Sequence, residues 1–300
     1  MFLTTDRLDF DREGRLWPHR ERSKFVTANG GRWHVQTFGP ENADRSIVLL
    51  HGTGASTHSW RALVSKLPDD VQVISLDLPG QGFSDPLKDR DPTLPNMGRA
   101  VASLLDALNI KHPLLIGHSA GAAIALQLAL DRPELAERVI SINGALYPFP
   151  GAASSIFPIL AKMLFLNPFV PHIFAAGAQG RHRVERLLQG TGSKLDDEGL
   201  ALYQTLFSNP SHVRSTLSWM ANWNLEPLVE RMGDVKQPFL QIIGSEDETI
   251  PPGNAFETET RIRHAETIKL RGYGHLVHEE EPGLVAHQVL SFSEKTFEPV

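Results

Sequence analysis

A serine between two glycines is the first feature of the sequence that could carry chemistry. The motif Gly117-His118-Ser119-Ala120-Gly121 follows the aliphatic run 112–116 and leads into a run of small, helix-forming residues. The pattern G-x-S-x-G is weak alone, because a chain of this length contains one by chance roughly one time in ten. Its place between a strand and a helix is typical of a nucleophile elbow, which exposes the serine hydroxyl. We interpret Ser119 as a candidate nucleophile; the alternative is a tight turn that merely contains a serine.

A serine hydroxyl needs a base to remove its proton, and the base needs an acid to orient it. In folds with such an elbow, the order along the chain is nucleophile, acid, histidine. Asp247 lies in the loop after the apolar run 238–245, and His275 lies in the loop after the run 266–272. Because parallel strands end at one edge of a sheet, Ser119, Asp247 and His275 are expected to converge there.

Both assignments have competitors among neighbouring residues. Glu246 and Glu248 flank Asp247, whose carboxylate could instead cap the helix that follows. His278 competes with His275, and the two together could form an H-x-x-H metal site, although the sequence indicates no third ligand. We retain Asp247 as the acid and His275 as the base, and we predict neither a metal nor an organic cofactor.

A glycine-rich turn could bind the negative charge that develops during acyl transfer. The run "LLHGTGAS", residues 49–56, puts a His-Gly turn after a strand. The backbone N–H of Thr53 in this turn, together with the N–H of Ala120, would form an oxyanion hole. A nucleotide loop is the alternative, but the run lacks both a P-loop lysine and the third glycine of a dinucleotide fingerprint.

The loop "DLPGQGFSD", residues 77–85, ends another strand. Asp77 is expected to fix this loop by hydrogen bonding rather than to do chemistry. Gln81 and Phe83 are predicted neighbours of the pocket, because the loop lies at the same edge of the sheet.

The elements that must position these residues alternate along the chain. Residues 23–38 indicate a hairpin, with its turn at 29–31. Six buried-strand runs follow, at 46–51, 71–77, 112–118, 138–144, 238–245 and 266–272. Helices are predicted at 60–67, 96–108 and 120–131, between successive runs. Aliphatic strands that alternate with helices predict an α/β fold, with a mostly parallel central sheet and helices on both faces.

The alternation stops between about Leu146 and Val235, where the sequence is helical in character and rich in aromatic residues and proline. We predict an α/β core of residues 1–146 and 236–300, with a helical cap insertion at 147–235. The aromatic residues of the cap could bind a large lipophilic ligand or form its own core; they are Phe149, Phe157, Phe165, Phe169, Trp219 and Trp223. The apolar segment 156–176 holds three prolines and Lys162, so we expect a lid or a membrane-surface patch rather than a transmembrane helix.

Composition narrows the classes of function. The chain has 300 residues, no cysteine and a formal net charge of −6. Disulfides, thiolate catalysis and cysteine-based metal sites are therefore excluded, and a nucleic-acid partner is not expected. The charged start of the sequence differs from a secretory signal, which predicts a cytoplasmic protein.

The hairpin, the His-Gly turn and the motifs "DLPGQGFSD", "GHSAG" and "GHLVHEEEP" together resemble the α/β-hydrolase superfamily over nearly the whole chain. The segments "HGTGASTHSWR", "GHSAGAAIALQLAL", "TGSKLDDEGLALY" and "WMANWNLEPL" resemble, more narrowly, the magnesium-chelatase accessory proteins of bacteriochlorophyll biosynthesis (the BchO type). Gln81 stands where that resemblance would lead us to expect a histidine. The resemblance implies Ser119 as nucleophile, Asp247 as acid and His275 as base. It also implies a role near magnesium insertion into a porphyrin in phototrophic bacteria, with magnesium chelatase as a partner.

Two hypotheses of different kinds follow. In the first, the protein is a serine hydrolase of a lipophilic or tetrapyrrole ester. In the second, it binds a porphyrin or docks on the chelatase, at the photosynthetic membrane or in the cytoplasm, and its triad is a relic. A perhydrolase or a C–C bond hydrolase would use the same three residues, and the sequence does not separate these from an esterase.

Overall fold

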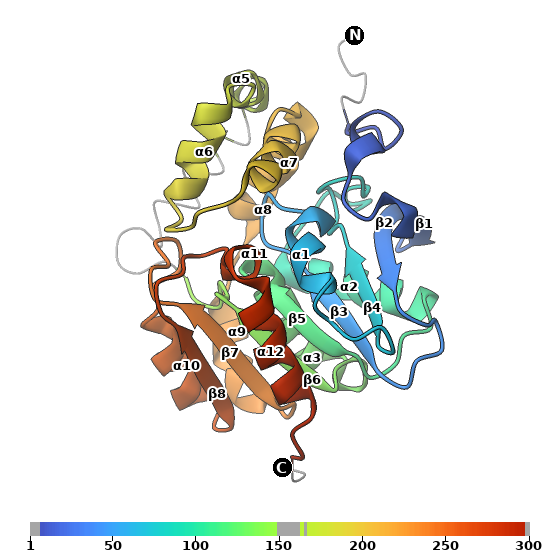
Figure 1. Ribbon diagram of the computed structural model, residues 1–300, viewed down its shortest axis with the longest axis vertical. Coiled ribbons are helices and arrows are strands. Elements are labelled where there is room, and N and C mark those ends of the chain that lie inside the picture. Colours follow the sequence, from blue (N-terminus) through green and yellow to red (C-terminus); the bar gives the residue numbers. More distant parts are fainter. Residues whose placement is uncertain (1–6, 149–162, 165–166, 298–300) are drawn as a thin grey trace.

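Eight strands form one sheet in the order β1-β2-β4-β3-β5-β6-β7-β8 (Figure 1). The structure is a computed structural model that describes residues 7–148, 163–164 and 167–297. The strands are β1 (Ser23–Ala28), β2 (Gly31–Phe38), β3 (Ser46–Leu50), β4 (Gln72–Leu76), β5 (Leu114–His118), β6 (Arg138–Ile142), β7 (Phe239–Gly244) and β8 (Ala265–Leu270). Each lies within two residues of a predicted strand, because long aliphatic runs leave little freedom in where a buried strand can lie.

The pairing is mostly parallel, as predicted. Strands β1 and β2 form the antiparallel hairpin, and β2 also pairs antiparallel with β4. From β4 through β3, β5, β6 and β7 to β8, every pair is parallel. Every residue of β4 and of β5 is buried, as expected of strands covered on both faces.

The helices are α1 (Arg61–Val64), α2 (Leu94–Ala107), α3 (Ala120–Asp131), α5 (Val170–Ala178), α6 (Arg181–Gln189), α7 (Asp197–Phe207), α8 (Pro210–Asn222), α9 (Glu226–Arg231), α10 (Asn254–Arg261), α11 (Val277–Glu280) and α12 (Pro282–Ser293). Short 3-10 helices are η1 (Glu13–Leu16), η2 (Arg20–Arg22), η3 (Thr57–Trp60), η4 (Pro133–Leu135) and η5 (Met232–Asp234). Two apolar clusters lie on opposite faces of the sheet: α2, α3 and α9 contribute to one, and α1 and α12 contribute to the other. In the described part of the chain, no helix is both long and apolar enough to cross a bilayer.

One predicted helix is shorter than expected. The stretch 60–67 contains only the end of η3 and the four residues of α1. Pro68 disfavours helical geometry at the residue before it, so the helix ends early.

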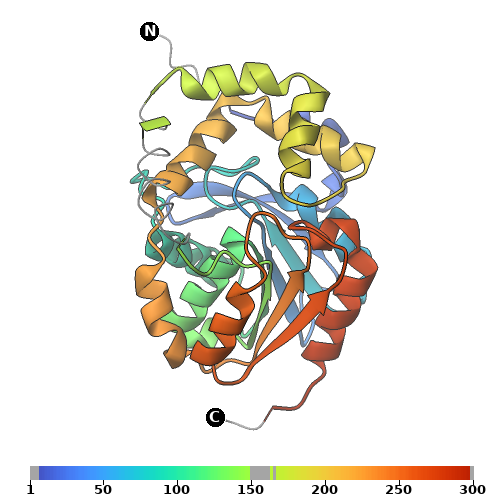
Figure 2. The same ribbon diagram turned by 90° about the vertical axis from the view of Figure 1, so that its left-hand side faces the viewer.

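Helices α5 to α9 lie between β6 and β7 in the chain. Helices α5 to α8 pack over the carboxyl ends of the strands, whereas α9 packs beside α3 on one face of the sheet (Figure 2). His212 of α8 bonds Gly54 O after β3 at 3.0 Å, and Trp219 of α8 donates to Pro79 O after β4 at 3.2 Å. On α7, Tyr203 donates to Glu279 after β8 at 2.8 Å. The insertion therefore lies over the loops in which the candidate site residues were predicted.

Candidate active site

Ser119 lies in the sharp turn between β5 and α3, with a positive φ of 51°. This conformation is strained for a residue with a side chain and is common at functional sites. A Cβ on Gly117 would collide with the backbone of α3, and a Cβ on Gly121 would collide with Leu50 O. The elbow can form only because both positions are glycine, and the turn leaves Ser119 9% exposed.

Asp247 and His275 lie side by side, although 28 residues separate them in the chain. Asp247 Oδ2 and His275 Nδ1 are 2.8 Å apart. The second carboxylate oxygen, Oδ1, accepts the backbone N–H groups of Thr249 and Ile250, each at 2.8 Å. The carboxylate of Asp247 accepts a hydrogen bond from Nδ1–H of His275, which keeps the proton on Nδ1 and leaves Nε2 as the basic nitrogen.

The histidine loop is joined to the serine elbow through His118, the residue before Ser119. His118 Nε2 is 2.9 Å from the backbone O of His275, and the two rings are 4.7 Å apart. Asn143, after β6, donates to the same oxygen at 2.8 Å and accepts the N–H of Gly244 at 2.8 Å. Asn143 thus ties the ends of β6, β7 and β8 together. Sequence reasoning did not assign it this function, because both partner loops lie about a hundred or more residues away.

The competitors of the predicted pair are engaged elsewhere. Glu246 accepts from Ser245 Oγ at the surface, and the backbone N–H of Glu248 donates to Thr191 O. His278 packs against the rings of Trp60 and His118 at 4.6 and 4.3 Å. Within the described residues, no group of three or more His, Asp or Glu side chains is arranged to hold a metal.

The predicted oxyanion turn lies directly against the elbow. A Cβ on Gly52 would be 3.1 Å from Ser119 Cβ and 2.8 Å from His118 Nδ1. Thr53 is the next residue, and Ala120 begins α3, where the first N–H groups have no partner inside the helix. Both predicted donors therefore belong to backbone that adjoins Ser119.

Burial keeps the neighbouring imidazoles neutral. Loss of solvation lowers the pKa of His51 and lowers that of His118 further, and the nearby His278 and His275 add to the effect at His118. Burial, reinforced by His275 and Arg61, lowers the pKa of His278 to about 3. The rings packed around His275 consequently carry no competing positive charge at neutral pH.

Asp77 is a structural residue, as predicted. Its carboxylate accepts from His34 Nδ1 and from the N–H groups of Thr57 and Phe83, at 2.7 to 2.9 Å. Although burial alone would raise the pKa of Asp77, His34, His51 and the N–H of Phe83 lower it to about 2. Phe83 packs against Trp17 and Phe10 at 4.9 and 5.0 Å and belongs to a small core.

The insertion contributes a segment that the sequence did not mark as part of the site. Thr191 O accepts the N–H of His275 at 3.1 Å and the N–H of Glu248 at 3.3 Å. Ser193 Oγ accepts the N–H of Leu276 at 2.8 Å. Residues 191–193 therefore lie between the acid loop and the histidine loop, and they bond to both.

A buried ion pair joins three parts of the chain behind the histidine loop. Arg61 of α1 donates to Glu279 of α11 at 2.6 Å and to Asp196, the N-cap of α7, at 2.7 Å. Tyr203 of α7 donates to the other oxygen of Glu279. Burial raises the pKa of Glu279 to about 7 in spite of the attraction of Arg61.

The aromatic residues predicted in the cap differ in their surroundings. Trp219 is buried, and its ring stacks at 6.1 Å on that of Trp223, which donates to Pro92 O. Phe169 is 69% exposed. Phe149, Phe157 and Phe165, with residues 156–162 and 165–166 of the apolar segment, lie outside the described residues.

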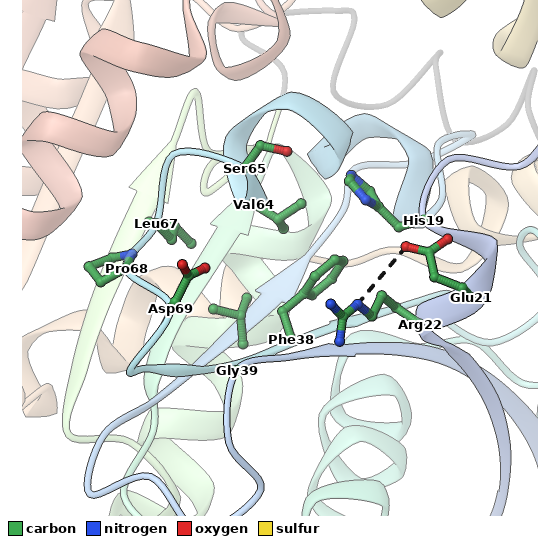
Figure 3. Close-up of a pocket in the computed structure, with 11 residues that line it drawn as sticks. His19, Glu21, Arg22, Phe38, Gly39, Val64, Ser65, Leu67, Pro68 and Asp69 are labelled. Carbon is green, nitrogen blue, oxygen red and sulfur yellow. Dashed lines mark ion pairs between the residues drawn. The ribbon is translucent and has the colours of Figure 1, made fainter.

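A pocket of about 170 Å³ lies away from these residues (Figure 3). Phe38 of β2, Val64 of α1 and His19 line it, and Glu21 and Arg22 form an ion pair of 3.9 Å at its rim. Small-molecule sites usually measure roughly 300–1,000 Å³, so this crevice is small for a substrate site.

Comparison with known proteins agrees with this architecture. The model of the alpha/beta hydrolase fold family matches residues 45–282. The magnesium-chelatase 30 kDa subunit of Rhodobacter capsulatus is 35% identical over 93% of the chain and 96% of its own length. An sn-1-specific diacylglycerol lipase of Xenopus laevis is 29% identical over 83% of the chain and 79% of its own length. The crystal structure of an alpha/beta hydrolase fold protein of Burkholderia ambifaria superposes with a TM-score of 0.75 at 23% identity, covering 89% of the chain and 97% of that protein.

Proposed function

The chain belongs to the α/β-hydrolase family, and from this premise we propose that it is a serine hydrolase that acts on carboxylic esters. Ser119 is the nucleophile, His275 the base and Asp247 the acid. The observation that carries the proposal is the 2.8 Å hydrogen bond between Asp247 and His275, beside a serine held in a strained elbow. A nucleophile, a base and an orienting acid are what acyl transfer through serine requires.

The proposed reaction has two halves. His275 Nε2 takes the proton of Ser119 Oγ as this oxygen attacks the ester carbonyl, and the oxyanion is bound by the N–H groups of Thr53 and Ala120. Collapse of this intermediate expels the alcohol, which receives the proton from His275. Water, activated by His275, then attacks the acyl-enzyme, releases the acid and restores Ser119. One oxyanion donor typically contributes about 3 kcal/mol of barrier lowering, so the Gly52–Thr53 turn matters to the rate.

For the substrate we propose a lipophilic ester, with a tetrapyrrole ester as the specific candidate. The kinship with a magnesium-chelatase subunit supports a tetrapyrrole. An apolar surface near the site also supports it: a Cβ on Gly54, next to Thr53, would lie 3.4 Å from the ring of Phe207. In this proposal residues 147–235 act as a cap over a core of 1–146 and 236–300.

Fluorophosphonate labelling of the purified protein, read by intact mass, tests this proposal. We expect one adduct that is lost in Ser119→Ala and His275→Ala and kept in the exposed controls Ser65→Ala and His287→Ala. An adduct that survives Ser119→Ala, or no adduct on a folded wild-type protein, would refute the assignment of the nucleophile.

The chelatase relative also favours a second candidate, a porphyrin-binding or chelatase-docking protein that does not use its triad. In that case added porphyrin quenches tryptophan fluorescence, and Ser119→Ala supports magnesium chelation as well as the wild type does. If Ser119→Ala fails to support chelation and porphyrin leaves the fluorescence unchanged, this candidate is excluded.

A further inference from the structure

Helix α5 buries small side chains and exposes large apolar ones, which is the reverse of an ordinary surface helix. Its buried side consists of small residues, Pro171, Ala175 and Ala178. Its outward side carries Ile173, which is 70% exposed, and Phe169 just before the helix is 69% exposed. Phe174, 42% exposed, flanks the buried side and packs against Phe207. Phe169 and Ile173 are four residues apart and therefore share one face. An ordinary surface helix buries its large apolar side chains and exposes its polar ones.

The exposed large hydrophobic side chains are concentrated in one short segment of the sequence. The described part of the chain exposes eight large hydrophobic residues, and five of them lie between 163 and 174. Single exposed apolar residues are normal on a surface, whereas a contiguous group marks a contact with another phase or molecule.

Helix α5 is positioned so that a flat surface could contact it along its whole length. The helix lies across one end of the molecule, roughly perpendicular to the longest axis (Figure 2). A flat, fluid surface can reach all the outward side chains of such a terminal helix at once.

Arginine side chains lie at both ends of α5. Arg214 donates to Pro168 O, just before the helix, at 3.4 Å. At the other end, a Cβ on Gly177 would be 2.7 Å from the guanidinium of Arg183. Arg186 on α6 is also exposed, and α5 itself carries no acidic residue. Guanidinium groups bind phosphate through paired N–H donors.

We propose that α5 and its flanking Arg183 and Arg214 form a docking surface for an anionic lipid bilayer. The helix lies in the plane of the headgroups, Phe169 and Ile173 enter the apolar boundary, and the arginines bind lipid phosphates. This surface combines large apolar side chains with cations, whereas a surface that binds an acidic protein through charge alone would not need the exposed apolar side chains. The inference goes beyond the proposed function and does not depend on it.

Aromatic contacts link this surface to the candidate site. The ring of Phe174 packs edge-on against Phe207 at 6.1 Å, and a Cβ on Gly54 of the predicted oxyanion turn would lie 3.4 Å from Phe207. Side-chain packing therefore connects α5 to the turn that contains Thr53.

Sedimentation of the full chain with vesicles tests the proposal. One set of vesicles contains phosphatidylcholine alone, and the other contains equal parts of phosphatidylcholine and phosphatidylglycerol. We expect binding to the mixed vesicles that weakens as salt is added. The double variant Phe169→Ser with Ile173→Ser should bind about tenfold or more weakly, and each of Arg183→Gln and Arg214→Gln about fivefold more weakly.

Matched controls lie elsewhere on the molecule. Phe256→Ser removes a side chain that is 73% exposed on α10, and Arg45→Gln with Arg263→Gln removes two exposed charges near the amino ends of β3 and β8. These controls should bind as the wild type does. No binding to mixed vesicles, equal binding to both kinds of vesicle, or equal losses in the controls would overturn the proposal. Fluorophosphonate labelling separates the two proposals, because a labelled protein that ignores vesicles refutes only the docking surface.

Discussion

The two carboxylate oxygens of Asp247 have different partners: one bonds the His275 ring, and the other bonds the backbone of its own loop. Oδ2 bonds the His275 ring, while Oδ1 accepts two backbone N–H groups of its own loop. A substitution that keeps Oδ1 as an acceptor and changes only Oδ2 can therefore separate catalysis from folding.

Asp247→Asn is that substitution. Its amide oxygen can still accept from Thr249 and Ile250, but its NH₂ group faces His275 and favours the wrong tautomer. We expect the rate of ester hydrolysis, or of fluorophosphonate labelling, to fall about 10⁴-fold, with the melting temperature nearly unchanged. Glu246→Gln, one residue away and without a contact to His275 in the described structure, should keep the wild-type rate. A full rate in Asp247→Asn would remove Asp247 from the mechanism.

The sequence was sufficient to predict that Asp247 and His275 meet, because each follows a strand of a parallel sheet. It was not sufficient for Asn143. Its bonds to His275 O and to Gly244 N depend on how the ends of three strands are spaced, and no local pattern records that spacing.

At the scale of elements, the positions of the strands were predictable from the sequence. For the insertion, only its helical character was predictable, and the packing of its helices was not. A buried strand shows itself as an aliphatic run, but the packing of the insertion depends on contacts far along the chain. Residues 191–193 are an example: their bonds to the acid and histidine loops make them part of the site's support.

Ser193→Ala tests that support. Ser193 is buried, and its hydroxyl accepts the N–H of Leu276, next to His275. Without the hydroxyl, that N–H is left unpaired, which should lower the free energy of unfolding by about 1–3 kcal/mol in urea titrations. A displaced His275 should also slow fluorophosphonate labelling by roughly ten- to a hundredfold.

Ser193→Thr keeps the hydroxyl and is the control for Ser193→Ala. Its labelling rate should return most of the way to that of the wild type. If Ser193→Ala loses stability but labels at the wild-type rate, the segment braces the fold without positioning His275.

At the scale of the whole molecule, the Arg61–Glu279 pair joins the core, the insertion and the histidine loop. Arg61 belongs to α1, Asp196 and Tyr203 to the insertion, and Glu279 to the helix after His275. Removing one partner of a buried pair leaves the other charge uncompensated. When Glu279 is neutralised, however, Arg61 keeps the carboxylate of Asp196 at 2.7 Å. No local sequence pattern indicates this cluster, since its members are spread over more than 200 residues.

Glu279 makes the strength of this junction depend on pH. Its pKa of about 7 in the folded state lies above the ordinary value of 4.5, so between these values the folded protein holds a proton that the unfolded chain has lost. Stability from Glu279 is therefore present below about pH 4.5 and is lost as the pH rises through 7. The buried histidines act in the opposite direction, because their lowered pKa values weaken the fold as the pH falls below 6.5.

Glu279→Gln separates the effect of the Glu279 carboxyl group on stability from that of the buried histidines. The histidines are present in both variant and wild type, so their contribution cancels when the two free energies of unfolding are subtracted. The amide can accept from Arg61 and donate to Tyr203, so it imitates the protonated acid at every pH. We expect the free energy of unfolding of Glu279→Gln, relative to wild type, to be higher at pH 8 than at pH 5.5 in urea titrations. The exposed control Glu230→Gln should show the same difference at both pH values. If the relative stability of Glu279→Gln instead falls as the pH rises, Glu279 is ionised throughout, and attraction to Arg61 outweighs the cost of burial.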